Sequence, residues 1–248
     1  MSKFQERLYR VKCAGGGLVS FTARVKETDL WITASRDLGR EAIESIMAHR
    51  RGLERYLVDN PLALTSLEPL PPDPLAPPLM AAMLAAGAKA GTGPMAAVAG
   101  AIAQAVGRDL AAAAGEVMVE NGGDVYLAAS RDITVGLEAG GSPISGRLGL
   151  RIAREDMPLC LGTSSGTVGH SLSLGRADAA TVKAADGALA DAAATALGNR
   201  VKSARDLEAA LDWVSGVEGV QGALIVIGAK LAAWGDMELV QLEPGRRK

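Results

Sequence analysis

Two alanine-rich segments in the middle of the chain, residues 79–89 and 94–114, constrain the fold more than any other feature. Their side chains are mostly small, so helices formed there can approach another backbone closely. Lys89, Arg108 and Asp109 interrupt the apolar sequence before it reaches the roughly 18–20 residues needed to span a bilayer. We therefore predict two helices buried against a sheet, and no membrane-spanning segment.

The first third of the chain has strand patterns followed by one long amphipathic helix. Alternation of apolar and polar residues predicts a β-meander in three segments, residues 8–13, 18–25 and 30–34. Residues 36–58 change to helical spacing, and Asn60-Pro61 ends that helix. Residues 61–78 hold seven of the eleven prolines, which predicts an extended connector on the surface.

Strand patterns return after residue 115. Short segments with glycine, asparagine or proline at their joints predict a largely antiparallel sheet: residues 116–120, 124–129, 133–138, 148–153, 159–162 and 179–184. Helices are predicted at residues 187–197 and 204–214, and a final hairpin joins residues 223–227 to residues 231–242. Strands grouped at both ends around central helices predict an α+β fold.

The composition excludes several classes of function. A hydrophobic content of 48% and a formal net charge of −2 indicate a globular protein without the basic excess of nucleic-acid-binding proteins. Cys13 and Cys160, taken with the two histidines, match no disulfide framework or zinc motif. Residues 1–10 lack the pattern of a secretory signal. We therefore expect a cytoplasmic protein that binds neither nucleic acid nor a membrane.

The segment from Gly91 to Ala96 matches the G-x-G-x-x-A form of a dinucleotide-binding loop. The residues before it are predicted to be helical, and no βαβ unit follows it. We therefore reject a Rossmann fold. The N–H groups at the start of the helix near Pro94 still favour an anion.

Asn121, Gly122, Gly123 and Asp124 lie between two predicted strands. One interpretation is a tight hairpin turn, because Asn-Gly tolerates positive φ values. The other is a ligand site, in which the two glycines expose the backbone while Asn121 and Asp124 offer directed polar contacts. Both interpretations stay open from the sequence.

A hydroxyl-rich segment, Thr163-Ser164-Ser165-Gly166, leaves a predicted strand and is followed by His170. Such a loop can hold a phosphate or a ribose, although solvent-facing loops of this composition are equally common. His170 fits either a general base or a side chain packed against a strand, and no orienting carboxylate is evident beside it.

Asp191 and Thr195 are four residues apart in a predicted helix, so their oxygen atoms lie one turn apart on the same face. Hard oxygen ligands in this arrangement suit Mg²⁺ better than zinc.

Taken together, these motifs resemble the ApbE family of FAD:protein FMN transferases. In that family the pattern A-I-A-K-G precedes N-x-G-G-D, T-S-G, a histidine and A-D-A-L-A-T-A-L; the corresponding stretches here are residues 96–100, 121–124, 163–166, His170 and 190–197. The resemblance covers roughly residues 93–199. It implies an α+β fold of the T-fold type, a largely antiparallel sheet with helices packed on one face.

The resemblance also implies a ligand and a metal. Asp191, Thr195 and a main-chain carbonyl near Ala96 would bind Mg²⁺, which would neutralise the pyrophosphate of FAD or another nucleotide. The remaining nucleotide-binding positions would be Asn121, Gly122, Gly123, Asp124, Thr163, Ser164, Ser165, Gly166 and His170. In the family's reaction the FAD diphosphate is broken and FMN is moved to a threonine of a target protein.

The chain also departs from the family pattern. Ala99 stands where the family has lysine, and Gln104 stands where an aspartate is expected. Two hypotheses follow: a Mg²⁺-dependent binder or transferase of a flavin-like diphosphate, similar to the cytoplasmic members of the family, or a non-catalytic scaffold with a decayed pocket. We expect one domain over residues 1–248, with the connector at 61–78, and a homodimer paired through sheet edges.

Overall fold

The computed structural model describes residues 17–166 and 175–242. The strand predicted at residues 8–13, Cys13 and His170 lie outside the described residues. The strands are β1 (Val19–Val25), β2 (Thr28–Ala34), β3 (Val117–Asn121), β4 (Asp124–Ala128), β5 (Ile133–Gly136), β6 (Leu148–Ile152), β7 (Leu159–Ser164), β8 (Ala179–Ala184), β9 (Val220–Ile227), β10 (Lys230–Gly235) and β11 (Glu238–Gln241). The helices are α1 (Gly39–Asp59), α2 (Leu62–Thr65), α3 (Pro78–Ala90), α4 (Val98–Ala114), α5 (Gly187–Arg200) and α6 (Leu207–Ser215), with short 3₁₀ helices η2 (Pro94–Ala97) and η3 (Arg154–Asp156).

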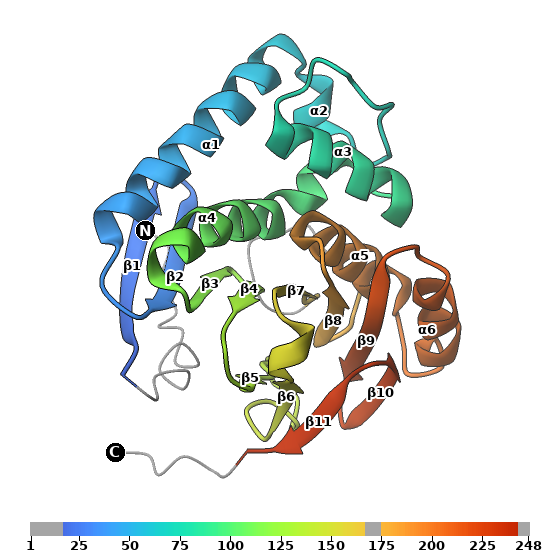
Figure 1. The fold of residues 1–248 in the computed structure, drawn as a ribbon. Helices are drawn as coiled ribbons and strands as arrows, with labels where there is room; N and C mark the ends of the chain where they lie inside the picture. The colour runs from blue at the N-terminus through green and yellow to red at the C-terminus, as the bar shows by residue number, and fades with distance from the viewer. Residues whose placement is uncertain (1–16, 167–174, 243–248) are drawn as a thin grey trace.

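The main sheet has eight strands in the order β1-β2-β3-β4-β7-β8-β9-β10, and each neighbouring pair is antiparallel. Most neighbours in the sheet are also neighbours in the sequence. The insertions between β2 and β3 and between β8 and β9 supply helices α1–α6; in Figure 1 α1–α5 lie above the sheet and α6 lies beside β9. This arrangement confirms the α+β prediction, including the helices on one face.

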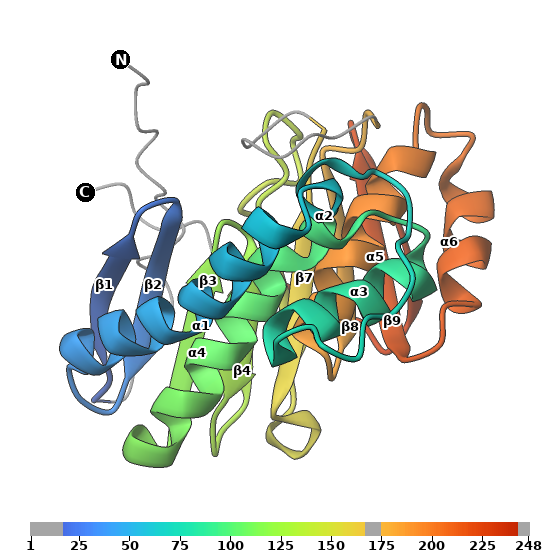
Figure 2. The ribbon, with the colours of Figure 1, turned by 90° about the horizontal axis from the view of Figure 1, so that it is seen from above.

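The helix layer packs closely because its contact points are glycines. A side chain on Gly100 of α4 would meet the carbonyl oxygen of Gly187 on α5 at 2.2 Å, and one on Gly107 would meet the Tyr126 ring at 2.1 Å. Ten residues of α5 are buried, most of them alanine. Figure 2 looks down on this layer, with α4 and α5 over the middle strands and α1 over β1 and β2. The alanine-rich sequence therefore forms the buried helices that it predicts.

The opposite face of the main sheet is covered by a second, three-stranded sheet in the order β11-β6-β5. Leucine, isoleucine and methionine side chains fill the space between the two sheets. The final hairpin predicted with residues 231–242 is therefore wrong in part. β10 pairs with β9, but the chain bends at Gly235, whose φ is +72°, and β11 joins the second sheet.

The prolines predicted an extended connector after α1, and this prediction is wrong in part. Residues 62–65 form the short helix α2, and a turn closed by the hydrogen bond from the Ala76 N–H to the Asp73 carbonyl interrupts the segment again before α3. The first half of the connector is tied to the helix layer, because the Gly93 N–H donates to the Leu67 carbonyl at 2.9 Å. None of the helices in the described ranges combines the length and the apolar character needed to cross a membrane.

Candidate functional site

The candidate site is built along one side of α5. Between Gly187 and Gly198 every residue of this helix is buried except Asp191 and Thr195, which keep partial exposure. The helix begins with a side-chain cap, in which the Asp186 carboxylate accepts a hydrogen bond from the Leu189 N–H at 2.9 Å. The two predicted metal ligands are thus the partly exposed residues of α5 between Gly187 and Gly198, and they form one strip along the helix.

The Asp191 carboxylate is held by the start of α4. Its Oδ2 accepts a hydrogen bond from the Gly100 N–H at 2.9 Å, and the Ala99 N–H also stabilises its charged form. α4 has no side-chain cap of its own, so Asp191 serves as the acceptor for its first amides. Withdrawal from water has the larger effect and raises the pKa of the Asp191 carboxyl to about 7.

The β3–β4 turn lies beside the same helix start. The Asn121 Nδ2 donates to the Ala99 carbonyl oxygen at 3.0 Å, while Gly122 and Gly123 adopt φ values of +71° and +126°. The turn interpretation of this motif is therefore right, because these φ values favour glycine. Asn121 contacts the α4 backbone, and its contact with a ligand stays a prediction.

Asp124, on the other side of this turn, faces the end of β7. Its Oδ1 accepts a hydrogen bond from the Thr163 N–H at 3.3 Å, and the residue is buried. Burial raises the pKa of the Asp124 carboxyl well above its ordinary value, and the negative charges of Asp191 and Glu120 act in the same direction. Asp124 is therefore harder to ionise while Asp191 carries its charge.

β7 runs directly against α5, because Gly162 has no side chain. A Cβ atom at this position would lie 2.3 Å from the Ala190 carbonyl oxygen and 2.6 Å from the Asp191 nitrogen. Beyond it, the Thr163 hydroxyl lies 3.1 Å from the Thr181 hydroxyl, and Ser164 lies beside Gly198 near the end of α5. Ser164 thus lies on the α5 side of β7, whereas the Thr163 side chain lies on the opposite face of the sheet, because successive side chains alternate along a strand.

The remaining predicted site residues lie at the margins of this arrangement. Ser165 and Gly166 continue from β7, and the Gly166 N–H donates to the Ala177 carbonyl at 2.9 Å. Ala96 belongs to η2, which packs against α5. In the part of the chain that the structure describes, no cluster of three or more His, Cys, Asp or Glu side chains could hold a metal ion. Any cation here would therefore need hydroxyl, carbonyl or ligand oxygens as well.

The dinucleotide-loop motif has a structural explanation, as its sequence context predicted. Gly91 ends α3 in a left-handed conformation, and Gly93 is pressed against the Ser66 carbonyl oxygen of the connector. Helix α3 precedes this loop and η2 follows it, so the strand of a βαβ unit is absent at this point.

Two residues of the site were not singled out from the sequence as structural links. Gln104 is buried and joins α4 to the start of α5, donating to the Ala185 carbonyl at 2.8 Å and accepting from the Gly187 N–H at 3.0 Å. Thr181 comes from β8 and faces Thr163 across the sheet. Gln104 is noted in the sequence only as a departure from the family pattern, and Thr181 carries no signal of its contact with Thr163.

The protein is therefore ApbE-like. Its antiparallel sheet is covered by helices, and these helices bring Asp191 and Thr195 to a glycine turn and a hydroxyl-rich strand end. Two solved structures share this fold. The apo flavinyl transferase ApbE of Pseudomonas stutzeri aligns with a TM-score of 0.54 and 13% identity, covering 88% of this chain and 94% of that one. The ApbE protein of Thermotoga maritima aligns with a TM-score of 0.55 and 14% identity, covering 87% and 96%.

Sequence comparison gives the family. The chain belongs to the ApbE-like family whose model is described as "AbpE bacteria", which matches residues 10–236. It is 40% identical over 227 residues to a UPF0280 protein of Methanocaldococcus jannaschii, covering 88% of this chain and 92% of that protein. It is 43% identical over 213 residues to a UPF0280 protein of Methanocella arvoryzae, covering 86% of each. The predicted resemblance to the ApbE family is confirmed.

Proposed function

We propose that this protein binds a flavin-type nucleotide diphosphate together with Mg²⁺, at the strip of α5 that carries Asp191 and Thr195. The observation that carries the proposal is that four segments of the chain meet at this strip. These are the start of α4, the β3–β4 turn, the end of β7 and the middle of α5, joined by the hydrogen bonds of Asn121, Asp124 and Asp191.

The donor groups fit a hard cation. Asp191 supplies a carboxylate, Thr195 a hydroxyl one turn away, and Ala96 a main-chain carbonyl on the adjacent η2. When bound, Mg²⁺ would neutralise the negative charge of the diphosphate. Asp191 must be ionised to act as a ligand, and the N–H groups of Ala99 and Gly100 favour that form against the effect of burial.

The chain's own residues would position the nucleotide. Gly122 leaves the turn backbone open to a phosphate or sugar, and Gly123 lets the turn approach the Thr163 carbonyl oxygen closely. Asn121 fixes the Ala99 carbonyl and thereby the start of α4. Thr163, Ser164, Ser165 and Gly166 would contribute hydroxyl and amide groups along the other side of the ligand. His170 is proposed as a further contact from the segment that follows.

The reaction that suits this arrangement is transfer of a nucleotide phosphoryl group. The oxygen of an acceptor hydroxyl would form a bond to the FMN phosphorus of FAD, the bond from that phosphorus to the bridging oxygen would break so that AMP leaves, and the hydroxyl proton would pass to water. The name of the Pseudomonas stutzeri structure, a flavinyl transferase, supports this class of reaction. Positioning and charge stabilisation would supply most of the catalysis.

A second candidate is a non-catalytic scaffold that retains the fold and binds a partner. The observation that favours it is the replacement of two family positions. Ala99 has no ionisable group, and the side chain of Gln104 is fully engaged in packing α4 against α5. A scaffold would bind neither FAD nor Mg²⁺ at the α5 strip.

Isothermal titration with FAD, FMN and ADP, each with and without Mg²⁺, tests the proposal. We expect the wild type to bind a diphosphate ligand only when Mg²⁺ is present, and Asp191→Asn to lose that dependence while it remains folded. Asp212→Ala, at an exposed carboxylate on α6, is the matched control and should bind as the wild type does. Equal binding by wild type and Asp191→Asn, or binding by neither, would contradict the proposal.

A further inference from the structure

A surface groove lies apart from the candidate site, between the turn that joins β1 to β2 and the outer face of α1. It has a volume of about 380 Å³, and its apolar lining comes from Val25, Met47 and Val58. Its charged lining has four basic side chains and one carboxylate, namely Lys26, Arg50, Arg51, Arg55 and Glu54. An apolar groove with a basic margin is suited to an apolar segment that carries negative charge.

Three of the four basic side chains are already paired within the chain. Lys26 contacts Glu54 at 2.6 Å, Arg50 contacts Glu27, and Arg55 contacts Asp59 at 3.1 Å. The fourth basic side chain is Arg51. Arg51 is exposed and makes no hydrogen bond or ion pair with any described residue. It lies one helical turn from Met47, so an uncompensated positive charge stands next to the apolar lining.

Large exposed apolar side chains gather on α1 and the segment that follows it. Among the described residues only one other, Val19, is exposed to a similar degree; the group comprises Ile43, Met47, Val58, Leu62, Leu64, Leu67 and Leu75. Leu75, at the far end of the connector, is 90% exposed. Apolar surface gathered in this way is typical of an interface rather than of a solvated face.

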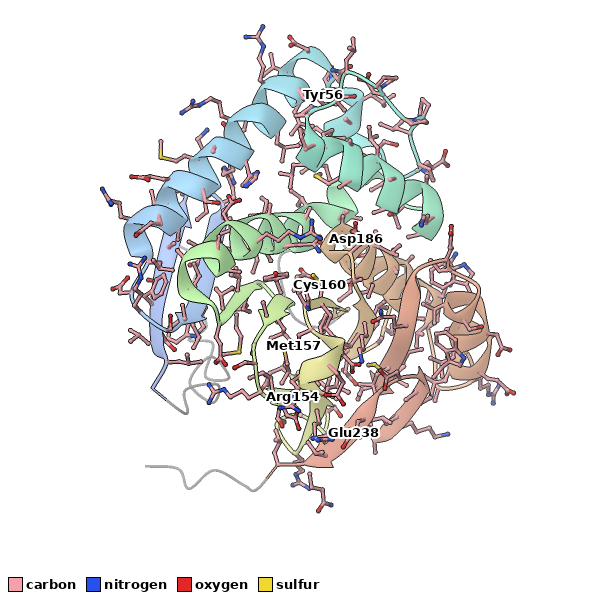
Figure 3. All side chains as sticks on the ribbon, in the orientation of Figure 1. Tyr56, Arg154, Met157, Cys160, Asp186 and Glu238 are labelled. Carbon is pink, nitrogen blue, oxygen red and sulfur yellow. The ribbon has the colours of Figure 1, made fainter. Side chains whose placement is uncertain are left out.

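The connector carries the negative charge that complements the basic margin of the groove. Residues 61–78 contain Glu68 and Asp73 but no lysine or arginine. The Tyr56 hydroxyl donates to Asp73 at 2.9 Å and holds the connector near the end of α1, where Figure 3 labels Tyr56. Glu68 is exposed, and its carboxylate has no partner in the described ranges. A proline-rich segment loses little conformational entropy on binding, so it is well suited to dock in a groove.

The connector cannot fill the groove of its own chain. Figure 2 shows β1 and β2 on one side of α1 and the connector on the other, where it passes over α3. The hydrogen bond from Gly93 to Leu67 fixes it there. A second copy of the chain carries the same acidic, leucine-bearing segment on its surface.

We propose that two copies form a two-fold dimer in which the connector of each docks in the α1 groove of the other, with Glu68 facing Arg51 and a connector leucine on the apolar lining. In such a dimer each contact occurs twice. This interface involves α1 and the connector, and it leaves the exposed edges of the sheets free. The proposal does not depend on the ligand of the candidate site.

Sedimentation equilibrium of the full chain tests the dimer. We expect a dimer for the wild type, and Arg51→Glu and Glu68→Arg should each raise the dimer dissociation constant by roughly tenfold or more, because a like-charge pair then occurs at both contacts. An equimolar mixture of these two variants should restore dimers, since each mixed pair then has opposite charges at both contacts. Leu75→Glu should weaken the dimer, and no mixture with Arg51→Glu should rescue it.

Arg205→Glu, at an exposed arginine just before α6, is the matched control and should dimerise as the wild type does. Arg51 and Glu68 are both exposed, so the variants should keep the wild-type thermal unfolding profile. A wild type that stays monomeric up to about 100 µM overturns the proposal. So does a dimer that Arg51→Glu and Glu68→Arg leave unchanged, or a monomer that binds anionic lipid vesicles through Arg51.

Discussion

The Asp191 carboxylate on α5 accepts a hydrogen bond from the Gly100 N–H at the start of α4, at 2.9 Å and across 91 positions of sequence. One carboxylate thus caps a helix and occupies the central position of the candidate site. Because the cap is supplied by another element, any change in the charge of Asp191 is transmitted to the start of α4. The contact links the stability of the helix layer to the chemistry of the site.

Replacing Asp191 should separate these two roles. Asp191→Ala removes the acceptor for the α4 amides and should lower the free energy of unfolding by about 1–2 kcal/mol, whereas Asp191→Asn keeps an acceptor oxygen and should cost less. Urea unfolding followed by circular dichroism measures both. Both variants should lose Mg²⁺-dependent binding. If the alanine and asparagine variants are equally stable, the carboxylate does not cap α4 as the structure shows.

The stability of the metal-free protein should depend on the ionisation of Asp191. The pKa of this carboxyl is raised from 3.8 to about 7, so the folded state holds the proton more tightly than the unfolded chain does. The stabilisation is present at low pH and is lost as pH rises through about 7, with a slope of at most about 1.4 kcal/mol per pH unit.

Other carboxyls titrate in the same range, so the informative quantity is the difference between wild type and Asp191→Asn. In the presence of a chelator, the wild type should lose stability relative to this variant as pH rises from about 4 to 7. A difference that does not change with pH would show that Asp191 has an ordinary pKa.

Gly162 should tolerate no side chain. A methyl group there would lie 2.3 Å from the Ala190 backbone, so Gly162→Ala must push α5 away from β7. We expect a loss of at least about 1–3 kcal/mol in the free energy of unfolding, and weaker nucleotide binding because Asp191 and Thr195 move with the helix. Gly141→Ala is the control, since a Cβ atom at residue 141 would have no neighbouring atom within 4 Å. Equal stability of the two variants would contradict the close approach.

On the other face of the main sheet, Lys183 is a buried cation that depends on two carboxylates. Its side chain is 3% exposed and pairs with Asp156 at 3.0 Å and with Asp236. The double variant Asp156→Asn/Asp236→Asn removes both carboxylates and leaves a buried, unpaired cation. It should lower the free energy of unfolding by about 3–5 kcal/mol. Lys183→Met removes the charge itself and should cost much less. Thermal unfolding compares them, and a larger loss for the methionine variant would be the contrary result.

Much of the fold is predictable because local patterns agree with it. The alternation in residues 18–25 and 30–34, and the spacing of apolar residues over 36–58, correspond to β1, β2 and α1. The second sheet is not predictable in this way. Its strands β5, β6 and β11 are short, and only the bend at Gly235 separates β11 from the hairpin that the apolar pattern suggests.

The candidate site shows the same division. The spacing of Asp191 and Thr195 predicts a shared helix face, and the Asn-Gly-Gly-Asp turn predicts positive φ values; both are local properties. The burial of Asp124, the Gln104 link and the contact from Thr163 to Thr181 depend on elements that meet only in the folded chain. A residue's type does not indicate which distant element it will face.

The most direct test of the central claim is a crystal structure of the protein with Mg²⁺ and FAD or ADP. The account predicts a cation with ligands at about 2.1 Å from Asp191 and Thr195, and a diphosphate beside Asn121 and Thr163. A nucleotide bound elsewhere, or an α5 strip closed by side chains when ligand is present at saturating concentration, would contradict it.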